Sequence, residues 1–260
     1  MAAALEAGVS RLFRIGGAHA VAALAFGTTL VPRVDKIVGP GNLYVAAAKA
    51  AVARRCAIDF YAGPTEIVIV AGAGRPGWIA ADLIAQAEHD VRAVAVLVTT
   101  TEEASRRTLE EVERQLADLP RRDIARRSLE DRGAAVVARD AAEAIRLADA
   151  FAPVHLVLLV RNAARWVPRL SRAGAVFLGS RTPEAVGDYL AGPSHVLPTA
   201  GTARFASPLS VATFRRRMSV LEMSPRALEA LAPAIEALAA AEGLEGHARA
   251  VRVRLAGRKR

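Results

Sequence analysis

Short β-rich runs of apolar residues alternate with longer amphipathic stretches from the start of the chain to about Gly179. The pattern predicts strands at residues 12–15, 36–38, 66–71, 93–99, 134–138, 155–160 and 175–178. It predicts helices that begin near residues 18, 42, 76, 102, 141 and 163. Strands that alternate with helices are typical of βα units around a parallel sheet, so we expect an α/β fold.

The pattern changes after Pro208, where alanine- and leucine-rich helical sequence replaces the strands. We expect one helix over residues 225–241 and a second over residues 247–255. Apolar side chains at helical spacing in the first of these need a partner surface, which the body of the protein or a second subunit could provide. These side chains are Leu228, Leu231, Ile235 and Leu238.

The beginning of the sequence predicts an incomplete parallel sheet. Its first helix leads directly into the predicted strand 12–15 and Gly16-Gly17, with no preceding βα unit. We therefore expect incomplete Rossmann-like parallel sheets with a C-terminal helical tail. The predicted domain boundaries are 1–65, 66–208 and 209–260.

Composition narrows the class of protein. The chain has 260 residues, 53% of them hydrophobic, which is enough for a sizeable core. Its net charge of +9 comes mostly from scattered arginines, and aromatic residues do not interleave with them, so we expect no nucleic acid partner. A single Cys56 allows no intramolecular disulfide and no thiolate pair for a metal. The first residues do not resemble a signal peptide, and no uncharged apolar run reaches the ~20 residues that span a bilayer. We expect a cytoplasmic enzyme with no membrane contact.

Polar side chains with metal-binding chemistry occur in three places. Asp188 and His195 lie in a loop that Gly and Pro residues punctuate, and Gln86 and His89 are spaced to share one face of a helix. His247 follows far downstream. Together they offer the nitrogen and oxygen ligands that a catalytic zinc ion accepts. Taken singly, the Gln86 and His89 pair is more typical of surface or capping residues, and His247 is more typical of a solvated or core-edge histidine.

Three further motifs allow both a functional and a structural interpretation. The turn Gly39-Pro-Gly41-Asn42 has free backbone donors for a phosphate or a nicotinamide cofactor, or is an ordinary tight turn between a strand and a helix. Thr65 and Glu66 precede a strand, where we expect the edge at which α/β proteins bind ligands, although Glu66 could be a simple exposed charge. His155 follows a proline bend and is either a general base or structural.

The motifs together resemble the histidinol dehydrogenase family. They occur in the order of that family, and they span the whole chain but only the later three-fifths or so of a full-length member. The segments that carry the resemblance are Ile15-Gly-Gly-Ala18, Val34-Asp-Lys-Ile-Val-Gly-Pro-Gly-Asn42, Ala62-Gly-Pro-Thr-Glu66, Gln86-Ala-Glu-His89, Ala152-Pro-Val-His155, Gly187-Asp-Tyr-Leu-Ala-Gly-Pro-Ser-His-Val-Leu-Pro-Thr199, Gly201-Thr-Ala-Arg-Phe205 and Glu242 to His247.

The resemblance implies a zinc-dependent, NAD-dependent homodimer that oxidises L-histidinol through the aldehyde to L-histidine. By motif, His155 matches the catalytic base, and the last zinc ligand comes from the partner subunit. The resemblance also implies roles for the three predicted domains. Residues 1–65 would form a partial cofactor-side domain, residues 66–208 the zinc and substrate domain, and residues 209–260 a helical dimerisation tail. The residues that match the zinc ligands are Gln86, His89, Asp188 and His247. The same four residues, together with His155, Thr65, His195 and Glu242, match the substrate site. His19 and Asn42 match cofactor contacts.

Three departures from the family pattern lead to further expectations. Val154 stands where the family has a glutamate that helps to activate water for the second oxidation, so we expect that step to be impaired. His19 stands where the family usually has glutamine, and an imidazole can still donate one hydrogen bond to the cofactor. The first part of a family member is absent, which predicts an exposed sheet edge and a poorly stable chain.

Two other hypotheses remain open at this point. One is a dehydrogenase of another small polar alcohol, such as a sulfonated diol, which would keep the metal ligands but change the substrate contacts. The other is a non-catalytic, zinc-binding remnant that pairs with another subunit, which Val154 favours.

Overall fold

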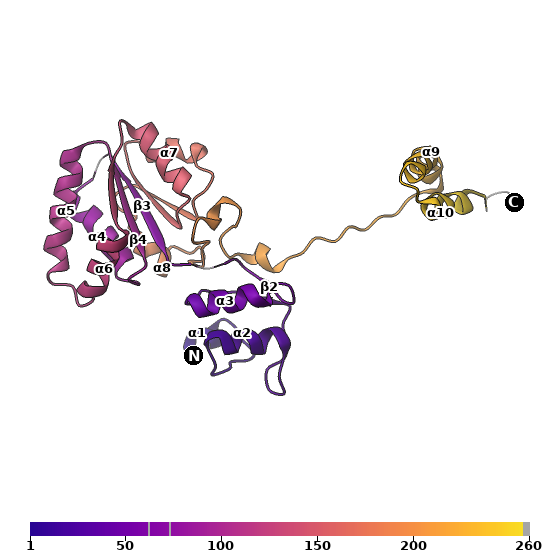
Figure 1. The fold of residues 1–260 in the computed structure, drawn as a ribbon, viewed down its shortest axis with the longest axis horizontal. Helices are drawn as coiled ribbons and strands as arrows, with labels where there is room; N and C mark the ends of the chain where they lie inside the picture. Colours follow the sequence, from indigo (N-terminus) through magenta and orange to yellow (C-terminus); the bar gives the residue numbers. More distant parts are fainter. Residues whose placement is uncertain (62, 73, 257–260) are drawn as a thin grey trace. The chain divides into compact units, whose positions relative to one another are not determined.

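The computed structural model describes residues 1–61, 63–72 and 74–256 and divides into two compact units, residues 1–214 and 215–260 (Figure 1). The first unit holds a five-stranded parallel sheet with the strand order β5-β4-β3-β6-β7. Its strands are β3 (Glu66–Ala71), β4 (Val94–Thr99), β5 (Ala134–Val137), β6 (His155–Leu159) and β7 (Ala175–Leu178). The α/β fold that the sequence predicts is confirmed.

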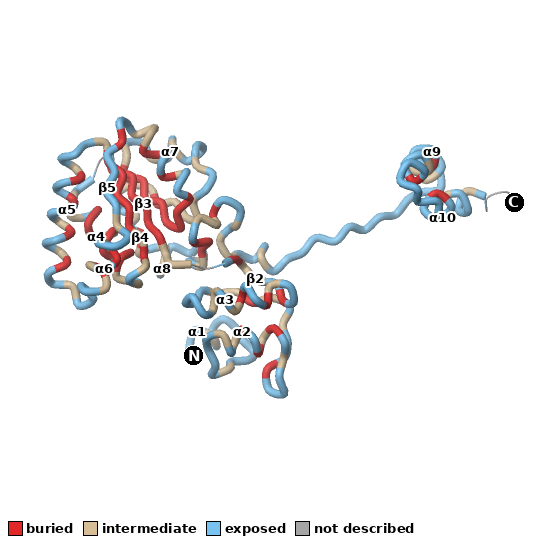
Figure 2. The backbone as a smooth tube through the Cα atoms, in the orientation of Figure 1, coloured by how far each residue is buried: buried red, intermediate tan, exposed pale blue. Residues whose placement is uncertain are grey.

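Helices cover both faces of this sheet. One face packs on α4, α5 and α6, and the other packs on α7 and the 3₁₀ helix η1. The central strands β3 and β6 are buried along their whole length, as the buried band in Figure 2 shows. Continuous Val, Ile and Leu runs are what a strand covered on both faces requires. The helices are α4 (Pro76–Ala87), α5 (Glu102–Leu116), α6 (Arg122–Arg132), α7 (Ala141–Phe151) and η1 (Ala163–Arg169).

Local capping signals set where these helices begin. Pro76 occupies the first turn of α4, where its missing donor has no cost. The side chains of Thr101 and Asp140 accept hydrogen bonds from backbone N–H groups in the first turns of α5 and α7. Ala152 then ends α7 in a left-handed conformation (φ 61°), which turns the chain towards β6 and the first residue of that strand, His155.

A small α/β element precedes the large sheet. Two short parallel strands pair Lys36 with Ala57 and Ile37 with Ile58, and two helices pack on them. Cys56 lies in this core, 2% exposed, which agrees with a small buried hydrophobe. The elements are α1 (Ala2–Glu6), α2 (Gly17–Phe26), β1 (Lys36–Ile37), α3 (Leu43–Val52) and β2 (Ala57–Ile58).

One local prediction was wrong, a second differs from the structure in helix type, and helix α6 was missed. Residues 12–15 are irregular rather than a strand, and Leu12 and Ile15 are 57% and 48% exposed, because these apolar side chains face no partner strand. The stretch near residue 163 forms a 3₁₀ helix, with Pro168 inside it. Helix α6 was not predicted, since its sequence is rich in Arg, Asp and Glu and buries only Ala125 and Ser128.

After β7 the first unit continues through short elements that carry the polar loop to the sheet. These are α8 (Ala185–Tyr189) and the 3₁₀ helices η2 (Thr202–Arg204) and η3 (Val211–Phe214). The second unit consists of α9 (Pro225–Ala241) and α10 (Glu245–Ala256), which pack on each other through alanines. Leu231, Leu238 and Val253 of this unit are 48%, 67% and 55% exposed. Within the described ranges, none of the helices combines the length and apolarity that crossing a membrane requires.

Candidate functional site

A cavity of about 490 Å³ lies at the amino ends of strands β3 and β6. Thr65 and His155 line it from the starts of these strands, while His89, Asp188 and His195 line it from loops and from α8. From the sequence we expected Thr65 and Glu66 to lie at the edge where open α/β sheets usually bind ligands, which is the edge formed by the carboxyl ends of the strands. That expectation was wrong for Thr65 and Glu66, because they enter β3 from its amino end.

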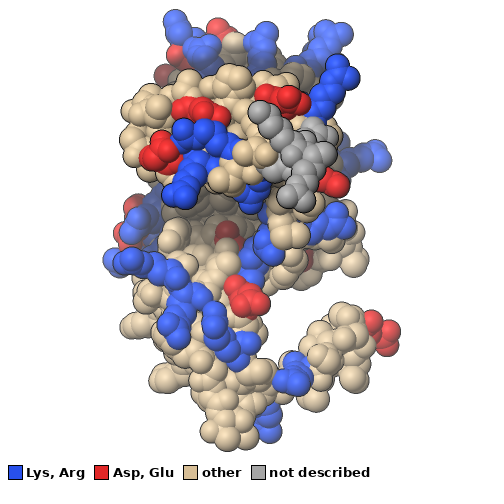
Figure 3. Space-filling model, turned by 90° about the vertical axis from the view of Figure 1, so that its right-hand side faces the viewer, with Lys and Arg blue, Asp and Glu red and all other residues tan. Residues whose placement is uncertain are grey.

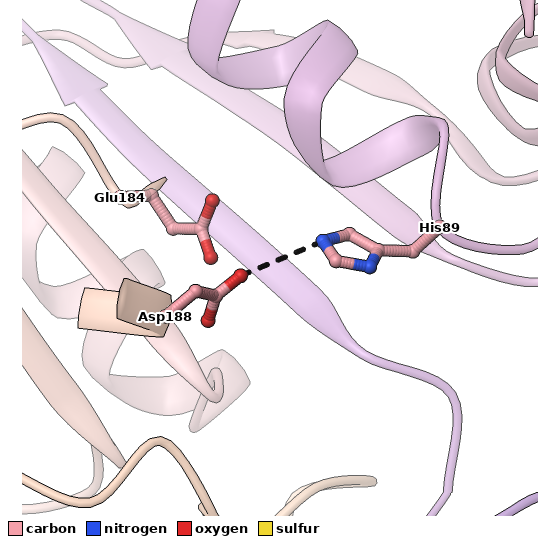
Figure 4. Close-up of side chains that lie close together, drawn as sticks. All are labelled: His89, Glu184 and Asp188. Carbon is pink, nitrogen blue, oxygen red and sulfur yellow. Dashed lines mark ion pairs between the residues drawn. The ribbon is translucent and has the colours of Figure 1, made fainter. Parts of the chain in front are cut away.

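Helix α4 and the turn after it place two of the candidate ligands. Gln86 lies in the last turn of α4 and is fully buried, and His89 follows the helix and is exposed. Nε2 of His89 lies 3.7 Å from Oδ2 of Asp188 on α8 (Figure 4). Oε1 of Gln86 lies 3.1 Å from Nδ1 of His155. An amide oxygen can only accept, so Nδ1 of His155 carries the proton and its Nε2 is free to accept one.

Glu184 is a site residue that the sequence analysis missed. It precedes α8, is 1% exposed, and places Oε1 3.5 Å from Nδ1 of His155. One ligand atom each from His89, Glu184 and Asp188 lie within 4.8 Å of one another, which is close enough for a shared metal ion. The spacing of Glu184 and Asp188, four residues apart, was the signal that could have found it, because such residues share a helix face.

Burial shifts the pKa values of three titratable groups at or near this cavity towards their neutral forms. Burial raises the pKa of Glu184 to about 8, and the nearby carboxyls of Asp188 and Asp82 add to the effect. Burial also raises the pKa of Asp82 to about 6. The pKa of His155 falls to about 4, again because burial disfavours the charged ring. Carboxyl groups that lie close together would release protons and become strong ligands if a divalent cation bound.

The glycine turn Gly39–Asn42 reaches the same cavity through Pro40 and Gly41. A buried ion pair fixes its position: Nζ of Lys49 pairs with Asp59 and donates to the carbonyl oxygen of Gly39 at 2.9 Å. The backbone N–H of Gly39 donates to Oδ2 of Asp59 at 2.8 Å. The side-chain oxygen of Asn42 caps α3, which leaves its amide N–H₂ group available to a ligand.

Glu66 is not the exposed charge that its sequence position allowed. It is 8% exposed, and burial raises its pKa although backbone N–H groups of Ala200, Val154 and Gly201 partly oppose this. The carboxyl group thus lies at the start of β3, close to the turn that contains Ala200 and Gly201. Thr199 in turn accepts a hydrogen bond from the N–H of Gly63 through Oγ1.

The remaining candidates lie on other elements. His19 is an exposed residue of α2. Val154 lines the cavity directly before His155. Glu242 is the C-cap of α9, and His247 lies in the first turn of α10. These last two residues belong to the second unit. Their role in the cavity stays a prediction.

The depressed pKa of His155 predicts a pH dependence of stability. The unfolded histidine binds a proton near pH 6.5, whereas the folded one does so near 4. The unfolded state therefore binds more protons in this window, and the fold loses stability as the pH falls from about 6.5 to 4, by about 3 kcal/mol. His155→Asn should remove this part of the acid loss in urea unfolding of the metal-free chain. His19→Asn is the exposed control, and an equal effect of both would contradict the prediction.

Comparisons with known proteins converge on one family. The family model described as histidinol dehydrogenase matches residues 1–255. The histidinol dehydrogenase of Moorella thermoacetica is 55% identical over 255 residues, which cover 98% of this chain and 60% of that protein. That of Geobacter metallireducens is 54% identical over 258 residues, or 99% of this chain and 59% of the relative. The crystal structure of histidinol dehydrogenase from Elizabethkingia anophelis matches with a TM-score of 0.93 and 38% identity, covering 98% of this chain and 59% of that one. The chain thus spans about three-fifths of the length of these proteins.

Proposed function

Because the chain belongs to the histidinol dehydrogenase family, we propose that it takes part in the NAD-dependent oxidation of L-histidinol through L-histidinal to L-histidine, the end of histidine biosynthesis. The observation that carries this proposal is the cavity at the amino ends of β3 and β6. It gathers five of the residues that the family resemblance assigns, although they are far apart in the sequence: Thr65, His89, His155, Asp188 and His195.

A zinc ion is part of the proposal, with Gln86, His89, Asp188 and His247 as its ligands. The donor set fits zinc because it consists of imidazole, carboxylate and amide groups without thiolates. The 3.7 Å between His89 Nε2 and Asp188 Oδ2 also suits two ligands whose bonds to zinc are each ~2 Å long. Bound zinc would supply Lewis acidity and a fixed point for the polar groups of histidinol.

His155 is the proposed catalytic base. Its low pKa keeps the ring neutral at pH 7, and Gln86 takes the proton of Nδ1 as a hydrogen bond. Nε2 can then accept the hydroxyl proton of the substrate as hydride leaves for NAD. Burial of the ring at the start of a central strand fixes its direction and excludes water.

The turn Gly39–Asn42 is the proposed contact for NAD, with the Asn42 side chain and His19 as its polar groups. The position of Pro40 and Gly41 at the cavity supports this assignment. Thr65, His195 and Glu242 are the proposed substrate contacts. In a homodimer with shared sites, Glu242 and His247 would come from the partner subunit.

A non-catalytic zinc-binding remnant is the second candidate, and one observation favours it. Val154 lines the cavity where a carboxyl group would serve the second oxidation, and its side chain can neither accept a proton nor orient water. A dehydrogenase of another small polar alcohol, such as a sulfonated diol, would keep the metal ligands. The position of His195 at the cavity supports histidinol over that alternative.

Metal content and hydride transfer distinguish these candidates. We expect the purified chain to hold about one zinc ion and to form NADH, measured by its absorbance, when histidinol and NAD are added. His89→Ala should lose both the metal and the reaction, while Arg139→Ala on the surface should lose neither. Zinc without hydride transfer would support the remnant, and NADH from a sulfonated diol but not from histidinol would support the other dehydrogenase.

A further inference from the structure

The small α/β element holds a buried ion pair that the proposed reaction does not use. Nζ of Lys49 on α3 pairs with the carboxyl group of Asp59, and the two side chains are 1% and 0% exposed. The lysines and arginines on the face in Figure 3 lie at the surface, in contrast to Lys49. Removing two charges from water is costly, and apolar residues of the same size are often at least as stable in their place. Stability alone therefore does not explain this pair.

The pair holds both backbone polar groups of Gly39, the first residue of the glycine turn. Nζ of Lys49 donates to the carbonyl oxygen of Gly39 at 2.9 Å, and the N–H of Gly39 donates to Oδ2 of Asp59 at 2.8 Å. Gly39 has a φ of 114°, a backbone conformation that residues with a side chain rarely adopt. Glycine loses more conformational freedom on ordering than any other residue, so the turn needs such contacts to keep one conformation. Pro40 and Gly41, which follow, line the cavity.

The same carboxyl group adds a contact beyond the end of the two-stranded sheet. Strands β1 and β2 pair at only two positions, of which the last joins Ile37 to Ile58. Asp59 directly follows β2, and its Oδ2 accepts the N–H of Gly39, two residues beyond β1. Oδ1 of Asp59 accepts the N–H of Phe60 at 2.8 Å, and Phe60 also lines the cavity. The buried pair thus connects the glycine turn to the cavity wall at Phe60, where the short sheet has ended.

We propose that Lys49 and Asp59 are positioning residues for the nicotinamide cofactor, which hold the glycine turn in the conformation that receives NAD. This inference rests on the cofactor part of the proposed function but not on the metal site. The turn leads into the amino end of α3, where backbone N–H groups suit the phosphates of a dinucleotide. Both side chains are buried and neither lines the cavity, so they act on the cofactor through the turn and not by contact.

Two double variants of the full chain separate positioning from stability. Lys49→Met with Asp59→Leu removes both charges and the acceptor for the glycine turn, while Lys49→Met with Asp59→Asn keeps an acceptor oxygen without a charge. Asp149→Leu on α7 is the matched control, because Asp149 also accepts two backbone N–H groups, those of Ser171 and Arg172, and does not line the cavity. The dissociation constant of NADH is measured by its fluorescence, the steady-state constants with histidinol and NAD, and the melting temperature by circular dichroism.

A turn that occupies its binding conformation for only part of the time binds with an affinity reduced by that fraction. We expect the Leu double variant to raise the dissociation constant of NADH and the KM for NAD by about 10-fold or more, because its turn has lost both anchors. Its kcat at saturating NAD should stay within about twofold of the parent value, since excess cofactor shifts the turn back to the bound conformation. The Asn double variant should bind NADH more tightly than the Leu double variant. Asp149→Leu should lower the melting temperature and leave the dissociation constant unchanged.

Other results would overturn the inference and separate it from the proposed function. An unchanged dissociation constant in the Leu double variant would show that the pair does not position the turn, and a lower kcat with an unchanged KM would show a purely structural role. Equal weakening in Asp149→Leu would show a general effect of lost stability. An Asn double variant that binds no better than the Leu double variant would remove Asp59 from the assignment. A parent chain that binds no NADH would refute both the inference and the cofactor part of the proposed function. A parent chain that binds NADH but oxidises no histidinol would refute the proposed activity, while the dissociation constants would still decide the inference.

Discussion

Replacing Val154 with glutamate is expected to raise the rate at which the chain oxidises histidinal to histidine by about 10² to 10⁴. This second oxidation needs water to add to the aldehyde before hydride can leave. A positioned carboxylate can take a proton from that water, whereas valine offers no acceptor. In the proposed mechanism the first oxidation, from histidinol to histidinal, uses His155 as its base, so its rate should change little.

The local structure allows this substitution to act at the site. Val154 lines the cavity, and its backbone carbonyl accepts the hydrogen bond of the Ala175 N–H at 2.8 Å. That bond joins the start of β6 to β7 and does not depend on the side chain. A longer side chain at Val154 can therefore extend into the cavity while His155 keeps its place at the head of the strand.

Separate assays of histidinol and histidinal with NAD measure the two steps. Val154→Gln is the matched control, because it has the same length as glutamate but cannot accept a proton. It should leave the second step slow. An equal gain with both substrates, or an equal gain with glutamine, would show that size rather than proton transfer limits the chain.

Most strands of the five-stranded sheet could be predicted from the sequence because their signals are local. The runs at residues 66–71 and 175–178 match β3 and β7, and those at 93–99 and 155–160 differ from β4 and β6 by one residue at one end. Each run is continuous, β-rich and bounded by turn residues, which is the signal that a strand inside a parallel sheet leaves in a sequence. The same local signal was misleading at residues 12–15, which pair with no strand among the residues that the structure describes.

The site was predicted less completely, because it depends on which side chains the fold buries. His155, Asp188 and His195 were found from residue type and from the Gly and Pro residues around them, and His89 was found from its helical spacing to Gln86. The fold brings these four side chains to one cavity. Glu184 was missed because neighbouring Pro183 and Ala185 give no hint that its carboxyl group is buried. The choice of the wrong sheet edge for Thr65 has the same origin, since the edge depends on how the loops fold back over the sheet.

A heterodimer of two defective chains is expected to bind zinc. The resemblance assigns His247 to the site of the partner subunit, and exposed Leu231, Leu238 and Val253 give the second unit an apolar surface that suits a partner chain. His89→Ala and His247→Ala should each prevent zinc binding in a homodimer. If sites are shared, a dimer with one chain of each kind holds one site with both mutations and one with neither.

Co-expression of the two variants with different affinity tags, followed by purification on both tags, isolates this heterodimer. We expect about one zinc ion per heterodimer, against about two per dimer of the parent chain. The Leu238→Asp variant should lose zinc by weakening the dimer, whereas the exposed control Arg106→Ala should not. If His247 instead served its own chain, both sites of the heterodimer would be defective and the purified protein would hold no zinc. Metal content therefore distinguishes a shared site from one that each chain completes by itself, because only a shared site lets the second unit of one chain restore the pocket of the other.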